Sequence, residues 1–444
     1  MVASNATVAE GDTVRLLIKV LDQRGQSMDS TALEFLSSDS SVVQVDSSGL
    51  LYGAAPGRAS VALIAGAARA DVTVNVTRTE GGWSFVNGRC GVWHTGRTYC
   101  WTWLGENRSL TPPYEVPGPE FVDLAAGRGH ACGLTKAGEA YCWGVNEFGQ
   151  LGDGTRNDQP APVRVAGNII FTAITVGVLH TCGLDRDGSA WCWGADRTGQ
   201  LGRGGSPPVC GSPCSLVPAR VSGDMRFRAI AAGGQDRVGQ GAVGRGFTCA
   251  LDESGKAYCW GYNEFGAVGD STDVDRNIPV AVAGTARFRT LTSGALHTCA
   301  LDRSTGLFCW GLGSTGQLGV PVPGPPESRC FAGDISYFCA RSPQEVASSE
   351  RWRTVAAGGA MTCGINLFGA AFCWGDNRDG QIGNGVQFPT GSERTVRTPS
   401  RVVGGLTFSG FGAYYNAVCG KAADGKGYCW GGGSATLVRI PDPQ

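Results

Sequence analysis

Cysteine and histidine are the residue types in this chain that could bind a metal or act in catalysis. The sequence has 18 cysteines and four histidines. A zinc or iron–sulfur site needs closely spaced ligands that converge on one point, and no two cysteines here have Cys-x-x-Cys spacing. The even number of cysteines instead predicts disulfides in an exported protein. The predicted pairs, seven of them ten positions apart, join Cys90 with Cys100, Cys132 with Cys142, Cys182 with Cys192, Cys249 with Cys259, Cys299 with Cys309, Cys363 with Cys373, Cys419 with Cys429, Cys210 with Cys214 and Cys330 with Cys339.

Three of the histidines, His130, His180 and His297, stand two positions before the first cysteine of a pair. A metal or acid–base site would require them to converge, whereas residues at one position of separate repeats lie apart. We therefore expect each histidine to be a structural residue that is hydrogen-bonded inside its own repeat. Residues 185–188 and 376–380 resemble parts of calcium loops, but they fit turn chemistry better. With no catalytic motif either, the sequence predicts no cofactor, no metal site and no enzymatic activity.

The regular cysteine pairs belong to a short hairpin that occurs seven times. In the register that pairs Cys132 with Cys142, Gly133 faces Tyr141 and a turn at 136–138 closes the two strands. The two cysteines then lie opposite each other at a separation that a disulfide can bridge. A tiny residue always follows the first cysteine, and its ring partner is expected to lie across the space that this residue leaves. Tryptophan always follows the second cysteine, which predicts wedges between neighbouring repeats.

The hairpins recur with a period that is typical of propellers and solenoids, since the pairs begin 42, 50, 67, 50, 64 and 56 residues apart. Around them stand a proline-x-x-valine run such as 162–165 and an aromatic-x-x-aliphatic run such as 171–174. This pattern predicts four strands per repeat. The first repeat lacks the proline run, and the chain ends with a strand-like run at 437–440. We therefore expect the C-terminal strand to complete the first blade and close the ring.

The amino-acid sequence of the repeat resembles that of a known family. His180-Thr-Cys-Gly-Leu, Trp191-Cys-Trp-Gly and Gly199-Gln-Leu-Gly are similar to the regulator of chromosome condensation repeat. The resemblance covers residues 83–444 and implies a seven-bladed β-propeller. It also implies guanine-nucleotide exchange on a small GTPase as the family's nuclear role, which export-type cysteines disfavour here.

Residues before the repeats follow a different pattern. Apolar and polar residues alternate in short runs, which predicts a small β-sandwich. The sequence of residues 37–50 resembles that of bacterial immunoglobulin-like domains. This resemblance implies a spacer or adhesion module without a chemical activity of its own. We therefore predict an all-β chain with an immunoglobulin-like β-sandwich at 1–78, a linker at 79–82 and a seven-bladed β-propeller at 83–444.

Charge and hydropathy exclude some classes of partner. The chain has 37 basic and 38 acidic residues, a formal net charge of −1, so it lacks the positive excess that nucleic acid or an acidic membrane surface would select. No apolar run approaches the length of a transmembrane segment. Together with the cysteines, this predicts an extracellular or cell-surface location, with a signal peptide or lipid anchor removed.

Three insertions interrupt the repeat, at 203–217, 234–247 and 320–342, and two of them contain an extra cysteine pair. Because strand direction alternates, we expect all three to emerge on one face of the propeller, over blades three to six. Drift at tolerant loops is one interpretation. The other is a preorganised recognition surface, since a disulfide reduces the ordering cost of binding. The candidate binding face comprises Pro207, Pro208, Val209, Gln235, Arg237, Arg245, Phe331, Tyr337 and Phe338.

These observations predict a secreted or cell-surface, non-enzymatic protein that presents this face to a protein or glycan partner. The alternative is a secreted inhibitor of an extracellular enzyme, by similarity to inhibitor proteins with this propeller architecture. A polysaccharide-active propeller enzyme and a guanine-nucleotide exchange factor rank below both. The identity of the partner does not follow from the sequence.

Overall fold

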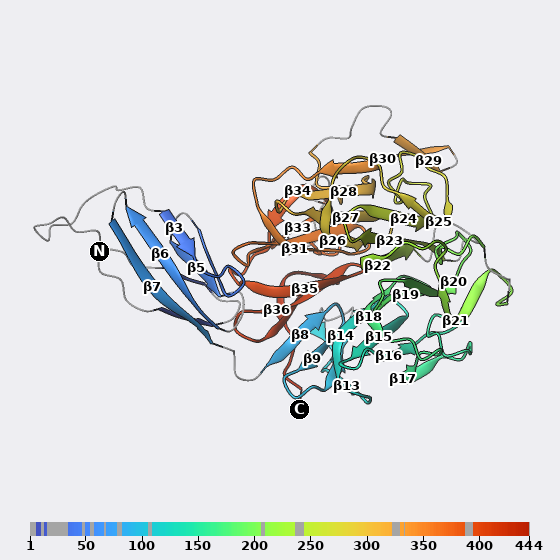
Figure 1. Ribbon diagram of the computed structural model, residues 1–444, viewed down its shortest axis with the longest axis horizontal. Coiled ribbons are helices and arrows are strands. Elements are labelled where there is room, and N and C mark those ends of the chain that lie inside the picture. Colours follow the sequence, from blue (N-terminus) through green and yellow to red (C-terminus); the bar gives the residue numbers. More distant parts are fainter. Residues whose placement is uncertain are drawn as a thin grey trace, which may run out of the picture.

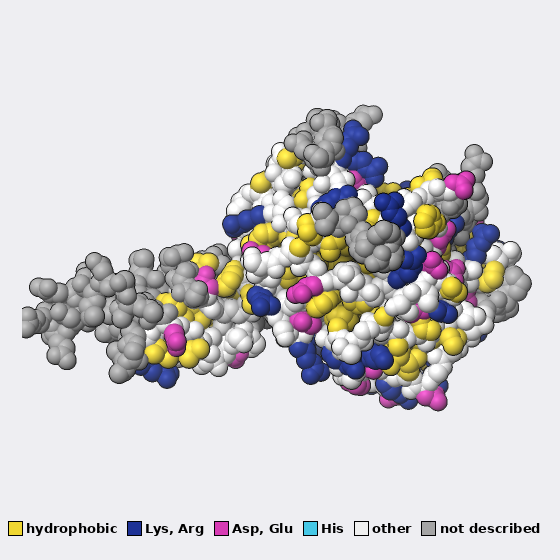
Figure 2. All heavy atoms as spheres, turned by 90° about the horizontal axis from the view of Figure 1, so that it is seen from above, with side chains coloured by type: hydrophobic (Ala, Val, Ile, Leu, Met, Phe, Trp, Pro, Cys, Tyr) yellow, Lys and Arg dark blue, Asp and Glu magenta, His cyan; other side chains and the backbone are white. Residues whose placement is uncertain are grey.

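The computed structural model describes most of the chain as β-structure. Every regular element in the described residues is a strand, and none of these residues forms a helix long and apolar enough to cross a membrane. Figure 2 shows basic and acidic side chains interspersed on the face that it displays, as the balanced composition predicts. The described residues are 6–9, 13–15, 34–46, 49–53, 57–65, 68–77, 82–104, 109–205, 209–235, 244–321, 329–332, 334–386 and 394–443.

The N-terminal strands form two sheets, coloured blue in Figure 1. One sheet has the order β1-β7-β6-β3 and the other the order β2-β5-β4. Buried valines and leucines from both sheets, including Val43, Leu51, Val61 and Val74, form one core. The strands are β1 (Ala6–Ala9), β2 (Thr13–Arg15), β3 (Glu34–Ser37), β4 (Val43–Val45), β5 (Leu50–Gly53), β6 (Gly57–Ala65) and β7 (Ala68–Thr77).

The repeats form successive antiparallel sheets that together make a propeller (Figure 1). The first three are β8 (Trp83–Asn87), β9 (Cys90–Trp93), β10 (Thr98–Cys100) and β13 (Tyr114–Val116); β14 (Phe121–Ala126), β15 (His130–Thr135), β16 (Ala140–Gly144) and β17 (Gln159–Arg164); and β18 (Phe171–Val176), β19 (His180–Asp185), β20 (Ala190–Ala195) and β21 (Cys214–Arg220). A separate pair joins β11 (Trp103–Leu104) to β12 (Ser109–Leu110).

In every sheet of the propeller an inner strand comes first, the two strands of a cysteine hairpin follow, and an outer strand comes next. The remaining sheets have the same order. They are β22 (Phe227–Gln235), β23 (Arg245–Asp252), β24 (Ala257–Gly261) and β25 (Arg276–Ala281); β26 (Phe288–Ser293), β27 (His297–Asp302), β28 (Leu307–Leu312), β30 (Ile335–Glu345) and β29 (Arg329–Ala332); β31 (Trp352–Ala357), β32 (Met361–Asn366), β33 (Ala371–Asp376) and β34 (Thr395–Arg401); and β35 (Phe408–Tyr414), β36 (Ala417–Ala422), β37 (Gly427–Gly431) and β38 (Ser434–Arg439).

The hairpin register and all nine disulfides are confirmed. Gly133 pairs with Tyr141 across β15 and β16, next to the paired cysteines of that hairpin. The seven hairpin disulfides join Cys90 with Cys100, Cys132 with Cys142, Cys182 with Cys192, Cys249 with Cys259, Cys299 with Cys309, Cys363 with Cys373 and Cys419 with Cys429. The two insertion disulfides join Cys210 with Cys214 and Cys330 with Cys339.

Distances between the bridged residues distinguish the two kinds of disulfide. In the seven hairpins the bridged Cα atoms are 4.1 Å apart, against 6.1 Å and 5.9 Å for the two insertion disulfides. The shorter distance follows from directly opposed positions in an antiparallel pair.

The space beside the tiny residue that follows the first cysteine is filled by a different aromatic ring from the one predicted. A Cβ atom on Gly133 would lie 2.6 Å from Cδ1 of Phe121, so the missing side chain makes room for a ring of the inner strand β14 and not for Tyr141. The tryptophans do act as wedges between sheets. For example, the Trp193 indole donates a hydrogen bond to the carbonyl of Gln150 in the preceding repeat (3.0 Å).

The expectation that the C-terminal strand completes the first blade is wrong. β38 pairs with β37 in the last sheet, with Cys429 opposite Val438, while β13 already supplies the outer strand of the first sheet. The first and last sheets of the propeller instead meet through side-chain packing, because Trp83 and Ile440 are buried in one cluster. The Trp83 amide also donates to the Gly425 carbonyl (3.0 Å).

Tyr52 links the N-terminal sheets to the propeller. The guanidinium of Arg353 lies over its ring, 4.6 Å from the centroid, and also donates to the Tyr52 hydroxyl. Gly369, in the turn between β32 and β33, packs against the same ring, since a Cβ atom there would lie 2.9 Å from Tyr52 Cε2. Tyr52 is completely buried. Residues 79–81 of the predicted linker lie outside the described residues.

Candidate functional site

The repeat histidines bond across neighbouring sheets, so the expected bond inside one repeat is wrong. His130 Nε2 lies 2.8 Å from the hydroxyl of Thr181, and His180 Nε2 lies 3.0 Å from that of Thr248. His297 makes the same contact with Thr362 at 2.9 Å. In each case the threonine belongs to the sheet that follows.

The direction of these hydrogen bonds shows which ring nitrogen of each histidine carries a proton. Thr181 donates its only hydroxyl proton to the Gln150 carbonyl (2.8 Å), so His130 Nε2 must be the donor in the bond between the two side chains. Burial lowers the pKa of His130 to about 3 and the pKa values of His180 and His297 to about 4. These imidazoles are neutral and fully buried at physiological pH. They are structural groups that join sheets.

The inserted segments share one face of the propeller. The segment 234–247 connects β22 to β23, whereas 203–217 connects β20 to β21 and 320–342 connects β28 to β30. In an antiparallel sheet the connection between the first and second strands leaves at the same edge as the connection between the third and fourth. The described ends of all three insertions therefore lie at one edge of their sheets.

The predicted face residues have different environments. Pro207, Pro208 and Arg237 lie outside the described residues. The side chains of Val209 and Phe331 are 57% and 61% exposed. Arg245, Tyr337 and Phe338 are partly buried, and Gln235 lines a cavity. The role of these residues in binding stays a prediction.

Contacts around the Cys330–Cys339 hairpin hold it against the fourth sheet of the propeller, which consists of β22, β23, β24 and β25. Tyr337 meets the ring of Phe265 edge-on at 5.3 Å, and the bridged cysteines are buried in the same cluster. Phe338 folds over Gly313, where a Cβ atom would lie 2.6 Å from its Cδ1. The insertion is therefore anchored by aromatic packing as well as by its disulfide.

Arg245 forms a polar cluster next to this hairpin. Its guanidinium lies 4.9 Å from the centroid of Tyr262 and 2.8 Å from the Glu264 carboxylate. Burial raises the pKa of Tyr262, and the hydrogen bond to Glu264 raises it further. The phenol therefore remains protonated and donates to Glu264.

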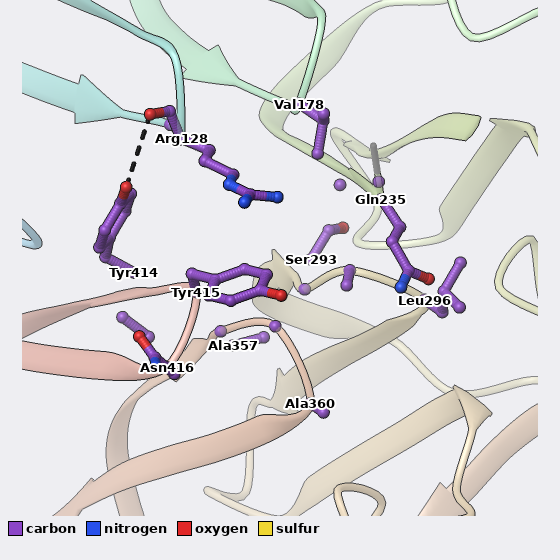
Figure 3. Close-up of a pocket in the computed structure, with 18 of the residues that line it drawn as sticks. Arg128, Val178, Gln235, Ser293, Leu296, Ala357, Ala360, Tyr414, Tyr415 and Asn416 are labelled. Carbon is purple, nitrogen blue, oxygen red and sulfur yellow. Dashed lines mark hydrogen bonds between the residues drawn. The ribbon is translucent and has the colours of Figure 1, made fainter. Parts of the chain in front are cut away.

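A cavity of about 470 Å³ lies at the centre of the same face. Its lining includes the turns that follow the inner strands, at 126–128, 176–178, 232–235, 293–296, 357–360 and 413–416. Gln235, at the start of the second insertion, belongs to this lining (Figure 3). The connection after β33 contributes as well, through residues such as Asp376 and Gln381. The cavity and the insertions therefore adjoin each other.

The polar groups of the cavity come from few turns. Arg128 lies over the ring of Tyr415 at 4.9 Å from the centroid, and the Tyr414 hydroxyl donates to the Arg128 carbonyl (3.5 Å). Asn416 donates to the Asp379 carboxylate (2.8 Å). Figure 3 shows the Arg128 guanidinium and the Tyr415 hydroxyl directed into the cavity, with Gln235 on the opposite side. In the described part of the chain, no cluster of three or more histidine, cysteine, aspartate or glutamate residues could hold a metal ion.

Sequence reasoning missed Arg128 and the turn at 414–416. A signal was present, because most repeats have glycine where the seventh has Tyr414, for example Gly127, Gly177 and Gly294. The predicted face rests on long insertions, whereas the seventh repeat differs here in residue type and not in length.

Comparison with known proteins places the chain in a family. Models of the regulator of chromosome condensation (RCC1) repeat match residues 137–184, 187–251, 254–301 and 306–365, and also 121–150, 171–200 and 240–267. The ultraviolet-B receptor UVR8 of Arabidopsis thaliana is 27% identical over 289 residues, 64% of this chain and 60% of the receptor. Human E3 ubiquitin-protein ligase HERC2 is 31% identical over 186 residues, 40% of this chain and 4% of the ligase. The chain thus spans less than two thirds of either relative.

Solved structures show the same fold. Yeast RCC1 (Prp20), solved bound to Kap60, is similar with a TM-score of 0.61 and 17% identity over 82% of this chain and 85% of that chain. Human WBSCR16 has a TM-score of 0.61 and 19% identity over 76% of this chain and 86% of its own. At such identities the likeness concerns the fold alone. With its repeat hairpins, its propeller and the family-model matches, this chain belongs to the regulator of chromosome condensation (RCC1) repeat family.

Proposed function

We propose that this protein is a secreted or cell-surface, non-enzymatic binding protein with an immunoglobulin-like β-sandwich at 1–78 and a seven-bladed β-propeller at 83–444. One face of the propeller receives a protein partner. The observation that carries the proposal is the shared position of the disulfide-braced insertions and the central cavity at one edge of the sheets.

Two properties of this face support binding. The Cys330–Cys339 hairpin is held by aromatic contacts with the fourth sheet, so little ordering entropy is lost when a partner docks on it. At the same time Val209, Phe331 and Ile335 are at least 57% exposed. Exposed apolar residues on a preorganised frame suit the apolar centre of a protein interface.

The cysteine usage supports an extracellular location. Nine disulfides join all 18 cysteines. Such a set persists in oxidising compartments and not in a reducing cytosol. A rigid, covalently braced propeller is suited to a surface that is exposed to proteases.

Affinity capture and binding measurements test the proposal. Wild-type protein is used to capture the partner from the native cell surface and medium, and affinity is then measured for a Val209→Ser, Phe331→Ser, Ile335→Ser variant. We expect binding at least about tenfold weaker, because interface anchors contribute about 1–2 kcal/mol each. The control is Val122→Ser, which changes a 58% exposed valine near the other edge of the sheet. Equal affinity of the triple variant and the control would overturn the face assignment.

A further inference from the structure

We propose that the N-terminal sheets dock on the propeller in one fixed orientation, at the edge opposite the insertions, with Tyr52 as the residue that holds them there. The proposal goes beyond the binding function, because it concerns how the two parts of the chain are arranged and needs no partner. It is carried by the burial of one outward-facing tyrosine, by the hydrogen bonds of one arginine and by the edge of the propeller at which they meet.

Tyr52 points away from the core of its own sheets. Side chains alternate between the two faces of a strand, and the neighbouring Leu51 lies in the core that the N-terminal sheets share. A tyrosine on the outer face of a small sheet is ordinarily part-exposed, whereas Tyr52 is completely buried. The surface that covers it belongs to the propeller, because Arg353 and Gly369 lie against its ring. The outer face of this sheet is therefore an interface.

Arg353 belongs to a set of arginines that join neighbouring sheets. Arg228 and Arg289 occupy the same repeat position, directly after the aromatic residue that begins an inner strand. Each of them donates to the carbonyls of the first two residues of the next inner strand. Arg353 donates to the first of these carbonyls, that of Phe408, and its other terminal nitrogen donates to the Tyr52 hydroxyl. The tyrosine thus takes the place of the second carbonyl.

These contacts hold the N-terminal sheets in one orientation because they are directional. A hydrogen bond from a charged donor depends on both distance and angle, and the same guanidinium lies 4.6 Å from the centroid of the Tyr52 ring. The chain is also attached one sheet further on, where the Trp83 amide donates to the Gly425 carbonyl (3.0 Å). Two separate attachments prevent the N-terminal sheets from rotating about either one.

Both attachments lie at the edge of the propeller opposite the insertions. The insertions follow the first or the third strand of their sheets, whereas Arg353 lies at the start of a first strand. Gly369 and Gly425 lie in turns between second and third strands, which leave an antiparallel sheet at that other edge. Figure 1 shows the N-terminal sheets next to β31 and β35 and far from β29. The docked arrangement therefore leaves the insertion face open to a partner.

NMR relaxation of the backbone amides in the full chain tests the inference, because it reports whether two parts of a protein tumble together. In wild type, we expect the amides of β4 and β5 to have the same rotational correlation time as those of the propeller. In Tyr52→Ala this common correlation time should be lost, and the N-terminal amides should tumble faster. Arg353→Ala should release them as well, because it removes the other side of the same contact.

Arg289→Ala is the matched control, because Arg289 occupies the same repeat position and its described hydrogen bonds lie within the propeller. This variant should keep the common correlation time. Should Tyr52→Ala fail to fold, Arg353→Ala decides the question, since it leaves the N-terminal sequence intact.

Three results would each overturn the inference. The first is a shorter correlation time for the N-terminal amides of wild type than for its propeller. The second is a common correlation time that persists in both Tyr52→Ala and Arg353→Ala. The third is equal release by Arg289→Ala and Arg353→Ala, which would show that loosened sheets, and not the Tyr52 contact, free the N-terminal part. The outcome is independent of partner capture, so the docking and the binding function can fail separately.

Discussion

Acid should destabilise the propeller through its buried histidines. His130, His180 and His297 have folded-state pKa values of about 3, 4 and 4, against 6.5 without burial. Because folding lowers these pKa values, the unfolded chain takes up protons first as the pH falls. The stability that the neutral histidines contribute is complete above pH 6.5 and is lost progressively between pH 6.5 and about 3–4.

The size of the effect follows from the pKa difference. At pH 5, about 1.5 units below the unfolded value, each histidine contributes a loss of about 2 kcal/mol. The three together should lower the free energy of unfolding by about 6 kcal/mol relative to pH 8. Such a loss is a large fraction of the stability of an ordinary domain.

Guanidinium chloride unfolding at pH 8, 6.5 and 5, followed by tryptophan fluorescence, measures this loss. The repeat provides its own control, because Met361 occupies the histidine position in the sixth blade and is fully buried there. A variant with all three histidines changed to methionine should lose most of the pH dependence between pH 8 and 5. If that variant is destabilised by acid as strongly as wild type, the buried histidines are not the cause.

Three further predictions concern the contacts between and within sheets. Thr181→Val should cost about 1–3 kcal/mol, because it leaves the His130 Nε2–H buried without an acceptor; the exposed Thr172 provides a Thr→Val control, and unfolding curves compare the two. Gly133→Ala should cost about 1–3 kcal/mol through overlap with an inner-strand ring, whereas Gly410→Ala, with no atom within 4 Å of the new Cβ, should be tolerated better. Reduction should destabilise the folded chain by about 2–3 kcal/mol for each hairpin disulfide opened, while chelators should leave its melting temperature unchanged; a chelator-induced shift would reveal a metal.

Local features of the fold could be predicted because their causes lie within a few residues of each other. The spacing of Cys132 and Cys142 fixes which residues face each other in an antiparallel hairpin, and the structure has this register. Contacts between sheets depend on how the sheets pack, which the spacing inside one hairpin does not encode. For this reason the predicted hydrogen-bond partner of His130 and the predicted position of the C-terminal strand were wrong.

The cavity could not be predicted because it is formed by turns that are far apart in the sequence. In the third repeat, Gly177 lies against the histidine ring, where a Cβ atom would approach His180 Cε1 to 2.3 Å, so this glycine and the histidine fix the turn together. The seventh repeat has Tyr414 and Ala417 at these two positions. The turn keeps its length, because Tyr414 pairs with Ala417 across two residues just as Gly177 bonds to His180 across two residues, and its first residue in the seventh repeat is Tyr415, at the cavity. The residue types of such a turn can therefore change while the disulfide hairpin behind it keeps its register.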